Sequence, residues 1–186
     1  IILRGTDPTR ASKAISLTEL GSIKLDKDET KKMLKTIPRS SVLGFLIGVL
    51  PGAGATIASF LAYGMERNYV SDEEKKKFGK GSVHGLAAPE TANNAACSGA
   101  FVPLLTLGIP GSGTTAVMLG ALLGFGIQPG PRLYMTNPEI FWSVIMSMYI
   151  GMVVLLILNL PLIPYIARIL AVPRTFLIPM ILFFSV

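Results

Sequence analysis

Long uncharged apolar stretches alternate with short charged segments along this chain, and the alternation predicts where helices lie. None of the apolar stretches, residues 41–65, 101–127, 141–160 and 176–186, contains Asp, Glu, Lys or Arg. The first is 25 residues long. As a helix it would extend about 37 Å, more than the roughly 30 Å of a bilayer's hydrocarbon core. The pattern predicts an all-α, polytopic membrane protein.

The same short phrase interrupts two of these stretches near their centres. Residues 50–56 read LPGAGAT and residues 109–115 read IPGSGTT. Pro51 and Pro110 each end a helix, and backbone left unpaired at membrane depth is tolerated only where it is buried in protein or lines a cavity. Paired breaks of this kind are typical of discontinuous or re-entrant helices in inverted-repeat secondary transporters.

The first broken stretch, residues 41–65, fits two topologies. It is either a crossing helix interrupted at its centre or a re-entrant hairpin whose tip reaches the midplane. Basic residues lie before it, at Lys35 and Arg39, and after it, from Arg67 to Lys80. Because Lys and Arg favour the cytoplasmic side, the charges favour the hairpin.

Two regions follow from this reading. We expect residues 1–40 to form a polar, basic cytoplasmic loop and residues 41–186 to form a transmembrane permease region. The second contains the broken helices 41–65 and 101–127 and the spans 141–160 and 176–186. The chain begins without Met and ends inside an apolar run, so we expect a fragment of a longer protein.

Composition and charge support a membrane protein and argue against a nucleic-acid partner. Hydrophobic residues make up 51% of the chain and charged residues 15%. The net charge is +6, but nine of the 17 Lys and Arg lie in residues 1–40 and five more in residues 67–80. These clusters flank apolar spans, where the positive-inside rule explains them without nucleic acid. The single cysteine, Cys97, excludes a disulfide framework.

The two breaks are the candidate substrate site. A helix that starts at a break offers free N–H groups and the positive end of its dipole, which suit a carboxylate. Glycine permits positive φ there and leaves room for a ligand. The alternative is that both phrases are simple kinks. The expected contacts at the breaks are Gly52, Ala53, Gly54, Thr56, Gly111, Ser112, Gly113, Thr114 and Thr115.

Polar residues inside the small-residue segment 82–100 are further candidates. Glu90 is the sole acidic residue between Gly81 and Pro131, and an intramembrane carboxylate is a candidate for coupling or gating. The alternative is that Pro89 and Glu90 begin a helix. Asn93 and Asn94 offer amides to a carboxylate or Na⁺, or else hydrogen-bond between helices.

Other chemistries find little support. Residues 108–115 match a phosphate-binding loop except that Thr114 replaces the essential lysine, which excludes nucleotide binding. One His and one Cys are too few for a metal site. No nucleophile and base stand together, so we expect no catalytic residues, no cofactor and no enzyme, including an intramembrane hydrolase.

Four phrases carry a resemblance to a known family: GVLPGAGATIASFLAYGMER, FGKGSVHGLAAPETANNAACSGA, PLLTLGIPGSGTTAVMLGALL and GIQPGPRLY. From about Ser41 onward the chain closely resembles the large permease subunit, of TctA type, of bacterial tripartite tricarboxylate transporters. It is similar to the second half of that subunit. It departs from the family at His84, where an acidic residue is common, and at Thr91 and Cys97, where alanine is usual.

The resemblance implies a function and partners. It implies a multi-pass protein of the bacterial inner membrane that moves citrate-like or other small carboxylates with a coupling cation, Na⁺ or H⁺. It also implies a small membrane subunit and a periplasmic solute-binding protein as partners. The alternative hypothesis is a membrane scaffold or assembly subunit without a substrate site.

Overall fold

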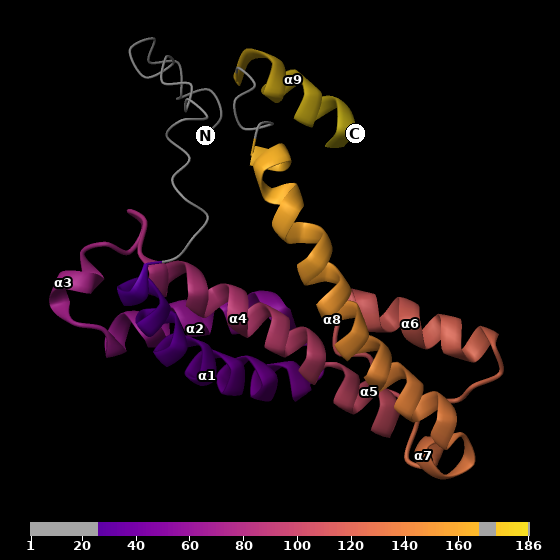
Figure 1. The fold of residues 1–186 in the computed structure, drawn as a ribbon. Helices are drawn as coiled ribbons and strands as arrows, with labels where there is room; N and C mark the ends of the chain where they lie inside the picture. The colour runs from indigo at the N-terminus through magenta and orange to yellow at the C-terminus, as the bar shows by residue number, and fades with distance from the viewer. Residues whose placement is uncertain (1–25, 168–173, 186) are drawn as a thin grey trace. The chain divides into compact units, whose positions relative to one another are not determined.

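The computed structural model describes residues 26–167 and 174–185, and every regular element in these two ranges is an α-helix (Figure 1). The expectation of an all-α fold is therefore confirmed for the described residues. Leu25–Ile145 form one compact unit, and the chain from Met146 onward belongs to a second. The helices are α1 (Lys27–Val49), α2 (Gly54–Tyr69), α3 (Asp72–Lys75), α4 (Val83–Gly99), α5 (Phe101–Leu107), α6 (Gly113–Gly124), α7 (Leu133–Thr136), α8 (Pro138–Ala167) and α9 (Arg174–Ser185).

Helix α1 runs without interruption across the expected boundary between residues 40 and 41. Asp26 begins it with a capping box, in which its side chain accepts from the backbone and Glu29 reaches back to the Asp26 N–H at 3.0 Å. Its first half is charged and its second half is apolar. Residues 27–40 are thus the first part of α1, and the first 25 residues of the expected loop lie outside the described range.

Helices α1 and α2 form a hairpin, and α4 packs against both (Figure 1). The Thr36 hydroxyl reaches the Glu66 carboxylate at 2.8 Å, so residues at equal distances from the first break lie opposite one another. The two helices are therefore antiparallel, as in a hairpin, and the re-entrant placement of this hairpin in a membrane stays a prediction.

Small residues at every fourth position form the core of this three-helix bundle. The buried rows are Thr36, Ser40, Gly44 and Gly48 on α1, Ala58, Ala62 and Glu66 on α2, and His84, Ala88, Ala92 and Ala96 on α4. A methyl group on Gly44 would lie 2.6 Å from the Ala92 Cα, and one on Gly48 2.6 Å from the Ala96 Cα. Such close backbone approach is typical of small residues at helix contacts in membranes.

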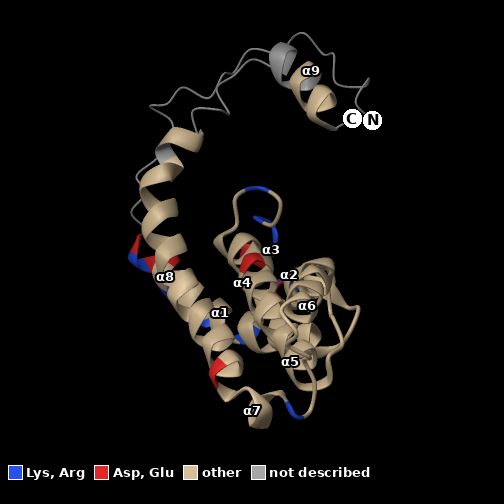
Figure 2. Cartoon of the chain, turned by 90° about the vertical axis from the view of Figure 1, so that its right-hand side faces the viewer, with Lys and Arg blue, Asp and Glu red and all other residues tan. Residues whose placement is uncertain are grey.

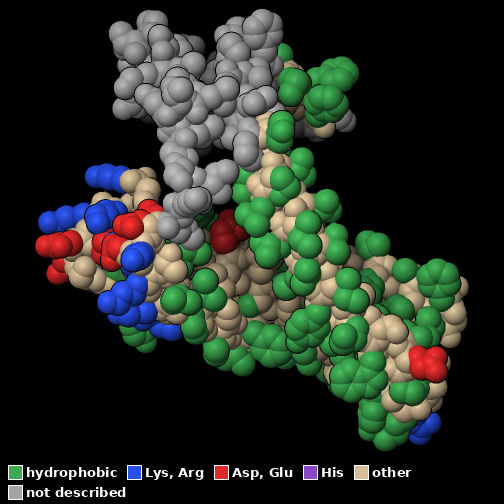
Figure 3. Space-filling view, viewed as in Figure 1, with side chains coloured by type: hydrophobic (Ala, Val, Ile, Leu, Met, Phe, Trp, Pro, Cys, Tyr) green, Lys and Arg blue, Asp and Glu red, His purple; other side chains and the backbone are tan. Residues whose placement is uncertain are grey.

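Large apolar side chains cover the outside of this bundle instead of filling it. Phe60 is 74% exposed and Leu46 58% exposed, whereas the buried cluster where α2 meets α4 consists of alanines. Figure 3 shows the apolar side chains in green over the visible surface of the bundle, with most of the charged ones gathered at one end around α3. A large exposed apolar surface marks contact with lipid or another protein.

Helix α8 is the one helix of the described residues that is long and apolar enough to cross a membrane by length and composition. Its candidate span, Pro138–Ile163, has 26 residues and a mean hydropathy of 2.4. The helix continues past Pro161 to Ala167, beyond the expected end at residue 160. Residues 101–127 contain two shorter helices, α5 and α6, on either side of a break. The described part of residues 176–186 lies in α9, which has 12 residues.

Charged side chains fasten α3 to α1. Lys32 lies 2.6 Å from Asp28 and 3.2 Å from Glu74, which also contacts Lys77 at 2.8 Å. Figure 2 shows charged residues around α3, while α5 and α6 carry none. The hydrogen bond from Lys77, together with the neighbouring Lys32, lowers the pKa of Glu74. The hydrogen bond from Lys32 lowers the pKa of Asp28. The carboxylates of Asp28 and Glu74 in turn raise the pKa of Lys32.

We expect acid to release α3 from α1. A carboxyl whose pKa is lower in the folded chain contributes its full stability above the unfolded value, about 4, and loses it as pH falls through the folded value. The contribution of Lys32, whose pKa is raised, is lost only as the solution becomes strongly alkaline. Hydrogen exchange of residues 72–78, corrected for its intrinsic pH dependence, should show weaker protection at about pH 3 than at pH 7. Equal protection at both values would contradict this account.

Candidate functional site

The two breaks line one cavity of about 680 Å³ within the first unit. They are far apart in sequence, yet the hairpin tip and the α5–α6 connection come together at the ends of α1 and α4. The lining residues are Gly52, Gly54, Ala55 and Thr56 from the first break, Cys97 and Phe101 from the segment between them, and Pro110, Gly111, Ser112, Gly113, Thr114, Thr115 and Ala116 from the second.

The first break reverses the chain with two left-handed glycines. Helix α1 ends at Val49, Gly52 has φ 83° and Gly54 has φ 71°, and α2 begins at Gly54. A side chain at either glycine would strain the backbone. Ala53, the N-cap of α2, gives no side-chain hydrogen bond. The first N–H groups of α2 therefore lack a side-chain acceptor where this helix meets the cavity.

The second break has a different backbone from the first, although the two phrases match in sequence. Here the left-handed glycine is Gly108, with φ 72° at the end of α5, while Gly111 and Gly113 do not have positive φ. Gly111 is buried, and a methyl group on it would lie 3.4 Å from the Ala100 Cβ and 3.7 Å from the Gly48 carbonyl oxygen. Gly111 thus packs near the ends of α1 and α4, and neither Gly111 nor Gly113 uses the positive φ that glycine permits.

Two of the four candidate hydroxyls are used to start helix α6. Ser112 and Thr115 form a reciprocal capping box, in which the Ser112 N–H donates to the Thr115 hydroxyl at 2.8 Å and the Thr115 N–H donates to the Ser112 hydroxyl at 3.3 Å. Thr56 and Thr114 are exposed, line the cavity and make no side-chain hydrogen bond to another described residue. Their hydroxyls are the ones available to a ligand.

The structure does not place the polar candidates of α4 on this cavity. The Asn93 amide donates to the Ser59 hydroxyl of α2 at 3.2 Å, which is the interhelical hydrogen bond of the alternative interpretation. The Asn94 amide donates to the Glu90 carbonyl at 2.9 Å, and both Asn94 and Glu90 are exposed. Ala53 does not line the cavity either.

The alternative interpretation of Glu90, that a helix begins at Pro89, is wrong. Helix α4 begins at Val83, six residues earlier, with Ser82 as its N-cap. The Ser82 hydroxyl accepts from the Gly85 N–H at 3.1 Å, and Pro89 lies inside the helix. Glu90 is thus a mid-helix carboxylate.

A buried ionic cluster joins α1, α2 and α4 near the charged end of the bundle, and the sequence analysis missed it. Glu66 is 0% exposed, and its Oε1 lies 2.7 Å from the Arg39 guanidinium, 2.8 Å from the Thr36 hydroxyl and 2.9 Å from the His84 Nδ1. Glu66 Oε2 and Arg39 Nε are buried without a hydrogen-bond partner. The available signal was the spacing, since Glu66 continues the four-residue row of Ala58 and Ala62.

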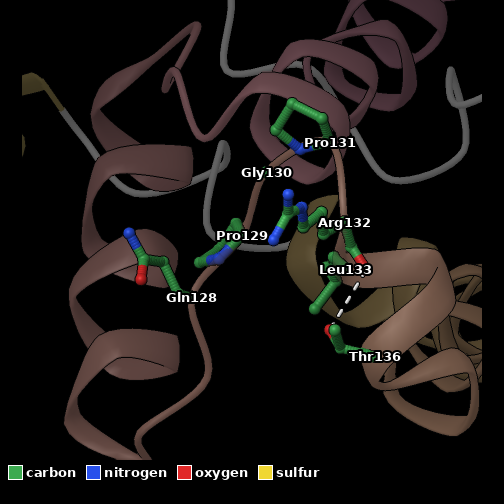
Figure 4. A pocket seen from close by; sticks show the side chains of 7 residues that line it. All are labelled: Gln128, Pro129, Gly130, Pro131, Arg132, Leu133 and Thr136. Carbon is green, nitrogen blue, oxygen red and sulfur yellow. Dashed lines mark hydrogen bonds between the residues drawn. The ribbon is translucent and has the colours of Figure 1, made fainter.

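A smaller cavity of about 440 Å³ lies in the turn after α6 (Figure 4). All its lining residues come from 128–136, and neither break contributes to it. The turn is held in place by the Gly130 N–H, which donates to the Leu105 carbonyl at 3.2 Å, and by the Thr136 hydroxyl, which donates to the Arg132 carbonyl at 3.1 Å. The segment Pro129-Gly130-Pro131 is typical of a turn, and this cavity is a feature of that turn.

The model of the tripartite tricarboxylate transporter TctA family matches residues 3–186. The chain belongs to the TctA family. This is a family of transporters, and the word tripartite implies partner subunits in general. No solved structure matches this TctA-family chain.

Two relatives of this TctA-family chain come from Agrobacterium vitis, and both are described as uncharacterized. One is the 52.8 kDa protein in the TAR-I ttuC' 3' region, 39% identical over 175 residues. The other is a protein in the TAR-II ttuC' 3' region, 46% identical over 142 residues. The matches cover 94% and 76% of this chain, but only 34% and 58% of the relatives. The chain thus spans about a third of the length of the TAR-I relative and somewhat over half of the length of the TAR-II relative.

Proposed function

We propose that this chain is part of the permease subunit of a cation-coupled, binding-protein-dependent transporter of small carboxylates. The observation that carries the proposal is the shared cavity, because two helix breaks that are separate in sequence line one space. Discontinuous helices that meet at one site are the usual architecture for binding anionic substrates in secondary transporters. Family membership supports the same reading.

The residues that line the cavity suit a carboxylate ligand, although none of them is Lys, Arg or His. Every residue that lines the cavity is uncharged. The negative charge of the substrate would instead be stabilised by the N-termini of α2 and α6, by the hydroxyls of Thr56 and Thr114, and by a coupling cation, Na⁺ or H⁺. Glu90, Asn93 and Asn94 lie outside this lining and stay candidates for coupling or for contacts with the rest of the protein.

The exposed surface supports a place in the bacterial inner membrane. Large apolar side chains cover the outside of the α1–α2–α4 bundle, and α8 is long enough to span a bilayer. The positive charge around α3 favours the cytoplasmic side for that end. We expect a small membrane subunit and a periplasmic solute-binding protein to complete the transporter. Because the relatives are longer, we expect the rest of the permease to close the cavity.

The transport hypothesis predicts that the two free hydroxyls contribute to substrate affinity. In the full-length permease with its partner subunits, Thr56→Val and Thr114→Val should each raise the KM for carboxylate uptake by up to about tenfold. Valine keeps the shape of threonine and removes one hydrogen bond, which is worth about 1 kcal/mol. Uptake of labelled carboxylates into proteoliposomes, with Na⁺ exchanged for choline at fixed pH, measures both the affinity and the coupling ion.

Thr106→Val is the matched control. Thr106 is exposed on α5, does not line the cavity, and donates its hydroxyl to the Val102 carbonyl at 2.6 Å. Its substitution should leave the KM unchanged. If Thr56→Val and Thr114→Val also left uptake unchanged while the protein inserted normally, the cavity would not be the substrate site, as a scaffold subunit requires.

A further inference from the structure

We propose that a basic pocket at the charged end of the bundle binds the phosphate group of an anionic phospholipid. The pocket has a volume of about 390 Å³ and lies between the first turns of α1 and the segment that joins α2 to α3. Among the residues that line it are Lys31, Lys32, Lys35, Arg39, Tyr69 and His84. It is separate from the cavity at the helix breaks, since the two share no lining residue.

Positive charge in this pocket exceeds what its own carboxylates neutralise. Lys32 already contacts both acidic residues of the lining, Asp28 at 2.6 Å and Glu74 at 3.2 Å. Lys31 and Lys35 make no ion pair with any described residue, yet they line the same space. Two free ammonium groups above a cavity are the donors that a phosphate needs.

The buried cluster holds the floor of the pocket in place. The Arg39 guanidinium is fixed by Glu66 at 2.7 Å and by the Tyr69 ring, whose centroid lies 5.1 Å away. The His84 Nδ1 contacts the same carboxylate at 2.9 Å. Glu66 holds the side chains of Arg39 and His84, which both line the pocket. Because these side chains are already fixed, little conformational entropy is lost when an anion binds.

The surface beside the pocket favours a lipid over a soluble anion. Lys31, Lys35, Arg39, Val42 and Leu46 follow one another at spacings of three and four, so they lie along one face of α1. Val42 is 62% exposed and Leu46 58% exposed. A basic group followed along the helix by exposed apolar side chains matches a phosphate followed by an acyl chain.

The membrane orientation agrees with this assignment. The Lys and Arg of this end favour the cytoplasmic side, and basic pockets on that side of a helical bundle suit anionic headgroups. The inference rests on the membrane placement of the proposed function but not on transport.

Lipid retention tests the proposal without a transport readout. The full-length protein with its partner subunits is purified in detergent, and binding of radiolabelled phosphatidylglycerol is measured by scintillation proximity, with phosphatidylcholine as the zwitterionic comparison. The double variant K31Q/K35Q should lower the affinity for phosphatidylglycerol by roughly thirtyfold, as expected for two lysines near an anionic lipid. Neither lysine makes an ion pair in the described structure, so the variant should fold.

The matched control is K76Q/K80Q, which removes the same charge from exposed lysines of the same end that do not line the pocket. It should retain phosphatidylglycerol as the unmodified protein does. Equal loss in both double variants, or no loss in K31Q/K35Q, would overturn the proposal. Displacement of the lipid by millimolar inorganic phosphate would overturn the lipid assignment in favour of a soluble anion. Because the assay does not depend on uptake, these failures are distinct from failure of the transport hypothesis.

Discussion

Gly48→Ala should destabilise the protein by about 2 kcal/mol or more, although alanine is the better helix former. A methyl group at Gly48 would lie 2.6 Å from the Ala96 Cα and in contact with the Ala96 carbonyl oxygen. Both atoms belong to the backbone of α4, so they cannot turn away as a side chain would. The helices must separate, and overpacking of this kind typically costs 1–3 kcal/mol. The midpoint of thermal unfolding in detergent, followed by size-exclusion chromatography, measures the change.

Gly120→Ala provides a control with the identical chemical change. Gly120 lies inside α6, and a methyl group there would meet no atom within 4 Å. Removing a helical glycine in open space should raise stability by up to about 1 kcal/mol. The two substitutions should therefore shift the unfolding midpoint in opposite directions, and equal shifts would mean that α1 and α4 are not in the close contact described.

Glu66→Gln should destabilise the protein by about 3 kcal/mol. The substitution removes the charge that compensates Arg39, while the three groups around Oε1 stay buried or half-buried. Breaking a buried ion pair by removing one partner costs 3–5 kcal/mol. Arg39 is 38% exposed and is partly solvated, which places the expected value at the lower end. Chemical or thermal unfolding of the purified variant gives the measurement.

Glu90→Gln is the comparison for this second prediction. Glu90 is exposed on α4, and its side chain makes no ion pair with a described residue. Its substitution should change the free energy of unfolding by less than about 0.5 kcal/mol. If both glutamates proved equally tolerant of glutamine, the buried cluster would not contribute to the stability of the bundle.

Local chemistry made the helix breaks predictable from the sequence. Proline and glycine act on their immediate neighbours, so the Pro-Gly-x-Gly phrases that begin at Pro51 and Pro110 mark the two breaks, whereas Pro89, which no such phrase follows, lies inside α4. The basic residues on both sides of residues 41–65 favoured a re-entrant hairpin; α1 and α2 are antiparallel, and their re-entrant placement in a membrane stays a prediction. The small-residue composition of 82–100 is likewise typical of a helix that packs closely, as α4 does.

Properties that depend on packing were not predictable. The matching phrases suggested matching backbones, but the left-handed glycine of the second break is Gly108, whereas Gly111 does not have positive φ and lies close to Ala100 and Gly48. Asn93 looked available to a ligand because its partner Ser59 lies 34 residues away in the chain. The role of Glu66 was not predictable either, because its partners Thr36, Arg39 and His84 are distant in the chain and contact it only in the folded bundle.

Because Gly111 lies near the end of α1, we expect the two breaks to move together. A methyl group built on Gly111 would lie 3.7 Å from the carbonyl oxygen of Gly48, four residues before Gly52, so the two backbones are close neighbours. A displacement of residues 110–112 toward α1 would press on the helix turn that leads into the first break. Backbone contact would transmit such a movement directly, without any side chain that could change rotamer to absorb it. Under the proposed transport function, a substrate that shifted one half of the cavity would thus shift the other half with it.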